Sequence, residues 1–336
     1  MSLKNLKTQV RIQFIVIFLL IFYLGWQELG NEGQNTSVKE ASVASDKQEG
    51  NAATGVAGTN HLPNYQAFIV PTPGEASFAG EKIPLQEPDL RERFDREIHV
   101  NANWHSNTIL MIKRAHRWMP TISKVLKENN IPDDFKYIVA IESNFEENAR
   151  SHRNAVGFWQ LLEGTAEQYG LEVNGEVDER RDPVKATEAA CEYLHDAYEK
   201  FGSWTSVAAS YNVGMRGLER RLEEQKVDSY FDVLLNDETA RYMFRVLAAK
   251  AILENPSAYG FNVPVAERYA QPEFDTVHVE ETIPDLVDFA HEHGITYKTL
   301  KRYNPWLRRE RLTVKRNTYD ILISKDPTEQ MVSVRN

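Results

Sequence analysis

Glu142 lies at a position where an ionised side chain is costly. Counting by three and four from Phe135 gives Ile138, Val139 and then Glu142, so this glutamate falls on the apolar face of an expected helix. Burial disfavours the charged form of a carboxyl group and raises its pKa, which suits a general acid that works near neutral pH. A single helical glutamate is also consistent with solvent exposure, helix capping or an ion pair.

Three further segments place polar side chains at expected helix ends. Residues 157–161 follow a polar loop, 151–154, and are expected to begin a helix. Residues 178–183 form a charged loop before an alanine-rich helix, and residues 210–214 close a helix of small residues, with Gly214 placed to end it. Taken alone, each segment is equally consistent with core packing, a structural loop or a simple helix end.

The elements that carry these segments are mainly helical. From Leu90 to about Glu254 the patterning is helical, with breaks at Gly, Pro and Asn and no convincing run of strands. Residues 63–88 are punctuated by prolines and are expected to lie extended along a domain surface. After residues 256–264 the order becomes β-α-α-β, which indicates a small separate module. Its strands are expected at 276–279 and 319–323, and its helices at 283–293 and 297–303.

Composition narrows the possible classes of protein. The 336 residues, 42% of them hydrophobic, allow one sizeable domain and smaller ones. A net charge of −10 argues against a nucleic-acid-binding protein. Cys191 is the only cysteine, so no disulfide forms within the chain and no cysteine metal site exists. The histidines show no metal-ligand spacing and no glycine-rich phosphate loop occurs, so we expect neither a metal nor a cofactor.

The N-terminal region predicts export. Lys4, Lys7 and Arg11 precede the apolar run 12–26, an arrangement typical of a cytoplasmic N-terminus whose following chain is translocated. No small-residue cleavage site follows the run, which favours an uncleaved signal anchor over a removed signal peptide. Residues 27–60 are too polar to fold and are expected to form a flexible tether.

In this order the segments resemble a known family, the lytic murein transglycosylases. The resemblance is to members whose catalytic domain is of the soluble lytic transglycosylase type and similar to goose lysozyme, and among them to the membrane-bound transglycosylase D type. The matching parts are Glu142-Ser143, Ala-Val-Gly-Phe-Trp-Gln at 155–160, Asp-Glu-Arg at 178–180 and Ser-Tyr-Asn-Val-Gly at 210–214. Phe158-Trp159 stands where Leu-Met is commoner, and Ser210 stands where Ala is usual. The resemblance covers about residues 132–225 and implies a lysozyme-like helical fold.

The resemblance implies cleavage of the MurNAc-GlcNAc β-1,4 bond of peptidoglycan with a 1,6-anhydroMurNAc end as product. Glu142 would act as general acid and then as general base on the 6-hydroxyl of the muramic acid itself. The side chains implied to orient the sugar and the acid are Ser143, Gln160, Tyr211 and Asn212, with Phe158 and Trp159 as sugar-facing walls.

Hydrolases instead pair their acid with a second carboxylate, about 5–9.5 Å away. The candidates for such a partner are poor, because Glu146 lies at a charged helix end, Glu147 points elsewhere, and Asp178 and Asp182 belong to the charged loop. A lysozyme-type hydrolase on the same fold and a non-catalytic cell-wall-binding protein remain as alternatives. Peptidoglycan strands are the expected partner, and no protein partner is predicted.

The C-terminal module resembles a LysM domain, a small peptidoglycan-binding fold. Gly-Ile-Thr at 294–296 and Leu-Lys-Arg-Tyr-Asn-Pro at 300–305 match, whereas Glu-Glu-Thr at 280–282 replaces the usual Gly-Asp-Thr. Glycan binding and a purely structural role both remain open for it. The expected organisation is a signal anchor at 1–29, a linker at 30–75, the catalytic region at 76–262 with its core at 131–225, and the LysM-like module at 272–326. The expected location is the periplasmic side of the cell envelope, anchored in the inner membrane.

Overall fold

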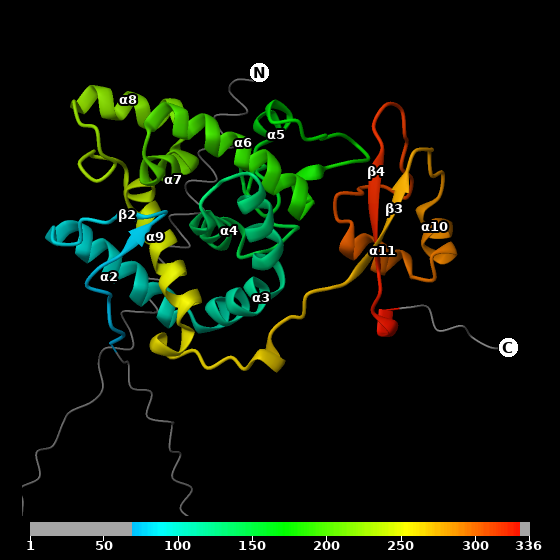
Figure 1. The fold of residues 1–336 in the computed structure, drawn as a ribbon, viewed down its shortest axis with the longest axis horizontal. Coiled ribbons are helices and arrows are strands. Elements are labelled where there is room, and N and C mark those ends of the chain that lie inside the picture. The colour runs from blue at the N-terminus through cyan, green and yellow to red at the C-terminus, as the bar shows by residue number, and fades with distance from the viewer. Residues whose placement is uncertain (1–68, 330–336) are drawn as a thin grey trace, which may run out of the picture. The chain divides into compact units, whose positions relative to one another are not determined.

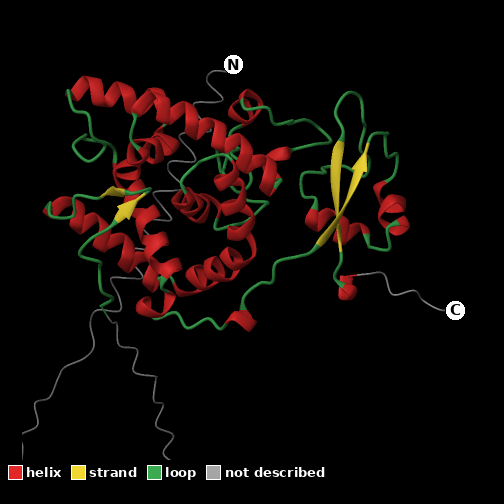
Figure 2. Ribbon diagram, viewed as in Figure 1, coloured by secondary structure: helices red, strands yellow, loops and turns green. Residues whose placement is uncertain are grey.

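Helices make up most of the regular structure of the chain, which the computed structural model describes for residues 69–329 (Figures 1 and 2). The α-helices are α2 (Pro88–Asn103), α3 (His105–Glu128), α4 (Lys136–Ser143), α5 (Glu163–Gln168), α6 (Pro183–Phe201), α7 (Trp204–Val213), α8 (Met215–Gln225), α9 (Asp237–Glu254), α10 (Leu286–Glu292) and α11 (Tyr297–Tyr303). Two antiparallel strand pairs join them, β1 (Ser77–Phe78) with β2 (Glu81–Lys82) and β3 (Phe274–Val279) with β4 (Tyr319–Ser324). The predicted mainly helical class is confirmed by these elements.

The predicted signal anchor lies outside the described residues, as does the predicted linker up to residue 68. Between residues 69 and 329, no helix is both long enough and apolar enough to cross a membrane.

The short helix α4 is defined by its two ends. A 3-10 turn, Asp133–Phe135, leads into it, and its two aspartates face the positive end of the helix dipole. The helix ends at Asn144, whose φ of 52° is left-handed. Between these ends lies a run of apolar residues, of which Ile138 has no exposed surface.

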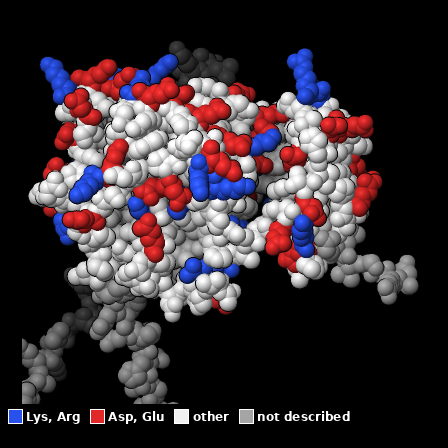
Figure 3. Space-filling view, in the orientation of Figure 1, with Lys and Arg blue, Asp and Glu red and all other residues white. Residues whose placement is uncertain are grey.

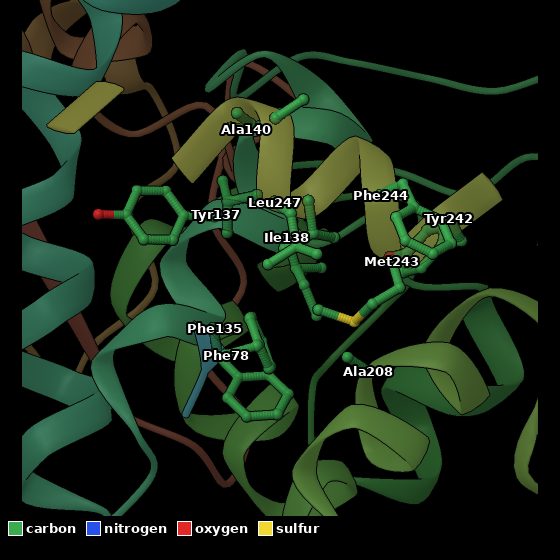
Figure 4. Packing of buried hydrophobic residues seen from close by; sticks show 14 of the residues in the cluster. Phe78, Phe135, Tyr137, Ile138, Ala140, Ala208, Tyr242, Met243, Phe244 and Leu247 are labelled. Atoms are coloured by element: carbon green, nitrogen blue, oxygen red, sulfur yellow. The ribbon is translucent and has the colours of Figure 1, made fainter. Parts of the chain in front are cut away.

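The helix α9 provides the surface on which α4 packs. Figure 4 shows Met243 and Leu247 of α9 close to Ile138 of α4 in the buried cluster. Helices α2 and α7 also contact α9, so this helix runs through the middle of the helical region. Full burial of one large apolar side chain contributes about 1.5–3 kcal/mol, and α4 is therefore held mainly by this packing rather than by its own helix propensity.

The segment expected to begin a helix at residue 157 forms a turned loop instead. The first helix after α4 is α5, and it begins only at Glu163. Gly157 has φ of 80° and Gln160 has φ of 49°, and both values are incompatible with a right-handed helix. Val156 forms antiparallel bridges with Arg150 and with Leu161, which fold the loop back on itself.

Local signals define the start of α6 and the end of α7, and the predicted end at Gly214 is confirmed. The side chain of Asp182 caps α6 by accepting hydrogen bonds from the backbone N–H groups of Val184 and Lys185, each at 2.9 Å. Pro183 occupies the first turn of the same helix. The helix α7 ends at Gly214, which takes φ of 79°.

The C-terminal module has the predicted order of β3, α10, α11 and β4. A small core with Leu286, Ile295 and Leu300 fills the space beneath the two strands. Val177, from the loop between α5 and α6, also belongs to this core and is 1% exposed. Its neighbours pair with the module through the backbone, because Asp178 N–H donates to Trp306 O at 2.9 Å.

Candidate active site

Glu142 lies in the last turn of α4, half-buried, beside α9. Its Oε1 accepts a 2.7 Å hydrogen bond from the hydroxyl of Tyr242. Burial raises the pKa of Glu142 above its ordinary value, and the negative charge of Glu238 raises it further. The hydrogen bond from Tyr242 and the positive charge of Arg245 oppose this rise. The raised pKa is the property expected of a general acid.

The residues of α9 that act on Glu142 were missed by the reasoning from sequence. Glu238, Tyr242 and Arg245 follow the spacing i, i+4 and i+7, so they lie along one face of the helix. Arg245 also donates to the backbone oxygen of Ile141 at 3.3 Å, in the last turn of α4. The signal in the sequence was a polar stripe on an otherwise apolar helix about 100 residues after Glu142.

The predicted residues Tyr211 and Asn212 lie at the end of α7, which faces the same site. The hydroxyl of Tyr211 donates to the backbone oxygen of Trp159 at 2.6 Å. Burial raises the pKa of Tyr211 well above its ordinary value, and the charge of Glu142 raises it further. Asn212 Oδ1 accepts a 2.9 Å hydrogen bond from Thr239 of α9. The structure therefore brings Glu142 and Tyr211 together and ties Asn212 to the helix that carries Tyr242.

Gln160 and Ser143 hold the backbone around the site. The side-chain amide of Gln160 donates to the backbone oxygens of Ala149 at 3.1 Å and Gly157 at 2.9 Å, which fixes the turned loop. Ser143 is buried, and its hydroxyl donates to the oxygen of Val139 in its own helix at 3.1 Å. In this arrangement the amide of Gln160 and the hydroxyl of Ser143 are bonded to backbone.

Phe158 and Trp159 were expected as sugar-facing walls, and the structure corrects this expectation. Both side chains are 0% exposed. Phe158 packs edge-on against Trp118 with ring centroids 5.2 Å apart, and the indole N–H of Trp159 donates to Thr187 Oγ1 at 2.9 Å. Two large apolar rings next to each other gain more by filling the core than by facing a cleft, so their role is packing.

The charged loop 178–183 braces the turned loop from behind. Asp178 accepts two hydrogen bonds from Arg180, at 2.8 and 2.9 Å, and both side chains are buried. Arg180 then donates to the backbone oxygens of Asn154 and Leu161, each at 3.2 Å. The ion pair therefore fixes both ends of the loop that carries Gln160.

The carboxylates weighed as partners of Glu142 are engaged elsewhere. Glu146 pairs with Arg114 at 2.7 Å, Asp178 pairs with Arg180, and Asp182 caps α6. Within residues 69–329, no cluster of three or more His, Cys, Asp or Glu side chains is arranged to hold a metal ion.

Two protein-family models match separate parts of the chain, the helical region and the C-terminal module. The family model for the transglycosylase SLT domain matches residues 119–233. The chain carries a transglycosylase SLT domain. The model for the soluble lytic transglycosylase C-terminal LysM-like domain matches residues 275–329. These two matches confirm the SLT-type domain and the LysM-like module inferred from the motifs.

The proteins similar to this SLT-domain chain match different shares of it. The chain is 25% identical over 324 residues to membrane-bound lytic murein transglycosylase D of Escherichia coli K12. The aligned region covers 94% of this chain and 69% of that protein. A putative tributyltin chloride resistance protein of an Alteromonas species is 32% identical over 104 residues, covering 30% of this chain and 49% of that one. The soluble lytic transglycosylase Slt70 of Escherichia coli aligns with a TM-score of 0.36 at 21% identity, over 45% of this chain and 26% of that one.

Proposed function

We propose that this protein is a lytic transglycosylase that cleaves the MurNAc-GlcNAc β-1,4 bond of peptidoglycan. The observation that carries the proposal is Glu142, a half-buried carboxyl group with a raised pKa, within the SLT-domain match and bonded to Tyr242. The relationship to membrane-bound lytic murein transglycosylase D, a murein enzyme by its name, supports the choice of substrate.

In the proposed reaction Glu142 first gives its proton to the glycosidic oxygen as the bond from that oxygen to the anomeric carbon of MurNAc breaks. The 6-hydroxyl of the same MurNAc then attacks the anomeric carbon and gives its proton to Glu142. This step restores the acid and leaves a 1,6-anhydroMurNAc end without consuming water. The hydroxyl of Tyr242, which bonds Oε1 at 2.7 Å, holds the carboxyl group in one orientation through both steps.

The supporting residues would act mainly through the backbone. Tyr211 connects the end of α7 to the turned loop through the oxygen of Trp159, and Gln160 closes that loop through the oxygen of Gly157. Asn212 and Ser143 complete the proposed frame, each bonded to a neighbour of Glu142 or of Tyr242. A rigid frame of this kind keeps the acid within reach of the scissile oxygen.

A lysozyme-type hydrolase is the second candidate, and one observation favours it. Glu238 on α9 is exposed and near enough to raise the pKa of Glu142, so it could supply the second carboxylate of a hydrolase. The two reactions leave different ends on the glycan.

The test is digestion of purified sacculi with the full-length protein in detergent, followed by mass spectrometry of the released muropeptides. A transglycosylase releases 1,6-anhydro ends, which are lighter by one water than reducing ends. Reducing ends would instead identify a hydrolase that uses Glu238, and Glu238→Gln would abolish their formation. Release of neither product would mean that the chain binds the wall without cutting it.

We further propose that the protein works at the periplasmic face of the inner membrane. The name of its relative, membrane-bound lytic murein transglycosylase D, supports a place in the cell envelope. The apolar run 12–26 with Lys4, Lys7 and Arg11 before it supports an N-terminal anchor.

A further inference from the structure

A polar cavity of about 190 Å³ lies behind the turned loop that carries Gln160. Four arginines contribute to its wall, Arg150, Arg180, Arg181 and Arg308. Two carboxylates share the wall with them, Asp178 and Glu163. Four positive charges and two negative ones leave an excess of two positive charges in a chain whose net charge is −10. Figure 3 shows acidic and basic side chains intermixed on one face of the protein, whereas the wall of the cavity has more basic than acidic side chains.

The two carboxylates of the wall form no ion pair with Arg150 or Arg308, and Asp178 lies nearer to Arg180 than to Arg181. Asp178 gives both oxygens to Arg180. Arg150 donates only to the amide oxygen of Asn154, at 2.8 and 3.2 Å, and Arg308 donates to the backbone oxygen of Asn174 at 2.7 Å. Glu163 is exposed in the first turn of α5.

Arg181 carries a further sign of an incomplete site. Its Nε lies 3.7 Å from Asp178 Oδ2, too far for a hydrogen bond, and this buried N–H has no hydrogen-bond partner among residues 69–329. A buried donor without a partner costs about 1–3 kcal/mol. Burial lowers the pKa of Arg181, and the positive charges of Arg308 and Arg180 add to this effect against the opposing charge of Asp178. An anion in the cavity would relieve both the missing bond and the repulsion.

We infer that this cavity is a binding site for an oxyanion, and that its ligand is a carboxylate of a peptide stem of peptidoglycan. The planar forks of Arg150, Arg181 and Arg308 suit the two oxygens of a carboxylate.

The position of the cavity argues for a stem attached to the glycan strand. Asn148 follows Glu142 by six residues and accepts a 2.5 Å hydrogen bond from Arg181. Arg150 follows Glu142 by eight residues. A glycan bound at Glu142 would carry its stems past this loop. This identification of the ligand rests on the proposed function, whereas the excess of cationic groups does not.

The experiment measures binding of soluble probes to the full-length Glu142→Gln protein by isothermal titration calorimetry. The probes are a free stem tripeptide with its carboxylates intact, the same peptide with its carboxylates amidated, and inorganic phosphate. The rim variants are Arg150→Gln and Arg308→Gln, both at exposed residues of the cavity wall. Arg150 bonds Asn154 of the turned loop, whereas Arg308 bonds Asn174 and not that loop, so Arg308→Gln tests binding without changing a contact of the loop. The matched control is Arg220→Gln on α8, a 66% exposed arginine paired with Glu224 and absent from the cavity wall.

We expect the intact tripeptide to bind, the amidated peptide to bind at least tenfold more weakly, and each rim variant to weaken binding about tenfold. Arg220→Gln should bind as the parent does, and all variants should unfold at the parent temperature. Equal binding of the amidated peptide, or no effect of the rim variants, would overturn the inference. Tighter binding of phosphate than of the tripeptide would overturn the carboxylate assignment and identify a phosphate site.

Sacculus digestion by the wild-type protein separates this inference from the proposed function. If anhydro ends appear but the tripeptide does not bind, only the stem site is wrong. If the tripeptide binds through Arg150 and Arg308 but no glycan is cut, the proposed activity is wrong and the anion site stands.

Discussion

The hydroxyl of Tyr242 donates a 2.7 Å hydrogen bond to Oε1 of Glu142, across one hundred residues of sequence. The bond joins the last turn of α4 to α9, orients the proposed acid and partly opposes the rise of its pKa that burial causes. Tyr211 lies close enough for its own pKa to respond to the charge of Glu142, so two tyrosines border the same carboxyl group.

Tyr242→Phe should lower turnover about tenfold or more, because a hydrogen bond to a charged group contributes roughly 1.5–3 kcal/mol. The bond favours the ionised form of Glu142, so its loss should raise the pKa of Glu142 further. Activity that needs the protonated acid is lost as pH rises through that pKa, and the alkaline limb of the pH profile should therefore move to higher pH.

The matched control for Tyr242→Phe is Tyr137→Phe. Tyr137 lies on α4 itself and donates to a different carboxylate, Glu254 Oε1, at 3.1 Å. Tyr137→Phe should leave both the turnover and the alkaline limb of the pH profile unchanged. An alkaline limb that stays unchanged in Tyr242→Phe would show that the hydroxyl does not control the acid.

Glu142→Gln should keep the fold and lose nearly all cleavage, since a positioned acid/base group typically contributes 10²–10⁴-fold. Anhydro ends released from sacculi measure the loss, and binding of glycan measures what remains. Retention of more than about a tenth of wild-type turnover would contradict the role of Glu142.

The same substitution should change how stability depends on pH. The pKa of Glu142 is higher in the folded state than in the unfolded state, so the folded protein holds this proton more tightly and loses stability as pH rises through the interval between the two values. Glutamine does not titrate. Glu142→Gln should therefore be more stable than the wild type above the folded-state pKa, and this advantage should vanish in acid, where the wild-type carboxyl is protonated in both states. Thermal unfolding at a series of pH values measures it.

The sequence-based predictions are confirmed where a feature depends on residues close in sequence, and they fail where it depends on contacts between distant segments. Periodicity places Ile138 and Glu142 on one face of α4 because both depend on the same local helix. The helix end at Gly214 is likewise predicted from its neighbours in sequence, and the structure confirms it. Tyr242 was missed because its partner lies on another helix, and no local pattern reports a contact between two helices.

Two other departures also come from tertiary contacts. Trp159 was expected at the sugar, but its indole bonds to Thr187 of α6 inside the core. Val177 directly precedes the charged loop 178–183, and its place in the core of the C-terminal module was not predicted. In both cases the side chain alone is compatible with either place, and only the packing of distant segments decides.

Gly157→Ala should destabilise the protein by at least about 2 kcal/mol. Its φ of 80° is left-handed, and an added Cβ would lie 1.8 Å from the backbone oxygen of Arg180. The substitution should also displace Gln160 and so reduce cleavage. Differential scanning calorimetry gives the stability change.

Gly164→Ala is the matched control, with no atom within 4 Å of its added Cβ and an ordinary place in α5. It should be neutral or stabilising by about 0.5–1 kcal/mol. A Gly157→Ala protein as stable as the control would mean that the turned loop can move away from residues 179–181.

The full-length protein should fractionate with membranes, with an N-terminal sequence that starts at or near Met1. The reason is the positive charge of Lys4, Lys7 and Arg11 before the apolar run, together with bulky residues where a cleavage site would lie. N-terminal sequencing of the membrane fraction measures this. A mature N-terminus between residues 27 and 60 would show a removed signal peptide and would leave the enzymatic proposal intact.

Exhaustive treatment with EDTA should leave glycan cleavage unchanged. In the proposed reaction Glu142 carries the proton and the MurNAc 6-hydroxyl is the nucleophile, so neither step needs a metal to activate water or to polarise the leaving oxygen. His291 and His293 are two residues apart in the C-terminal module, so His291→Gln with His293→Gln tests whether that pair binds an ion that matters for cleavage. This double variant should cleave sacculi at the wild-type rate, with and without EDTA. Activity that EDTA removes and one divalent ion restores would contradict a mechanism carried by a single carboxyl group.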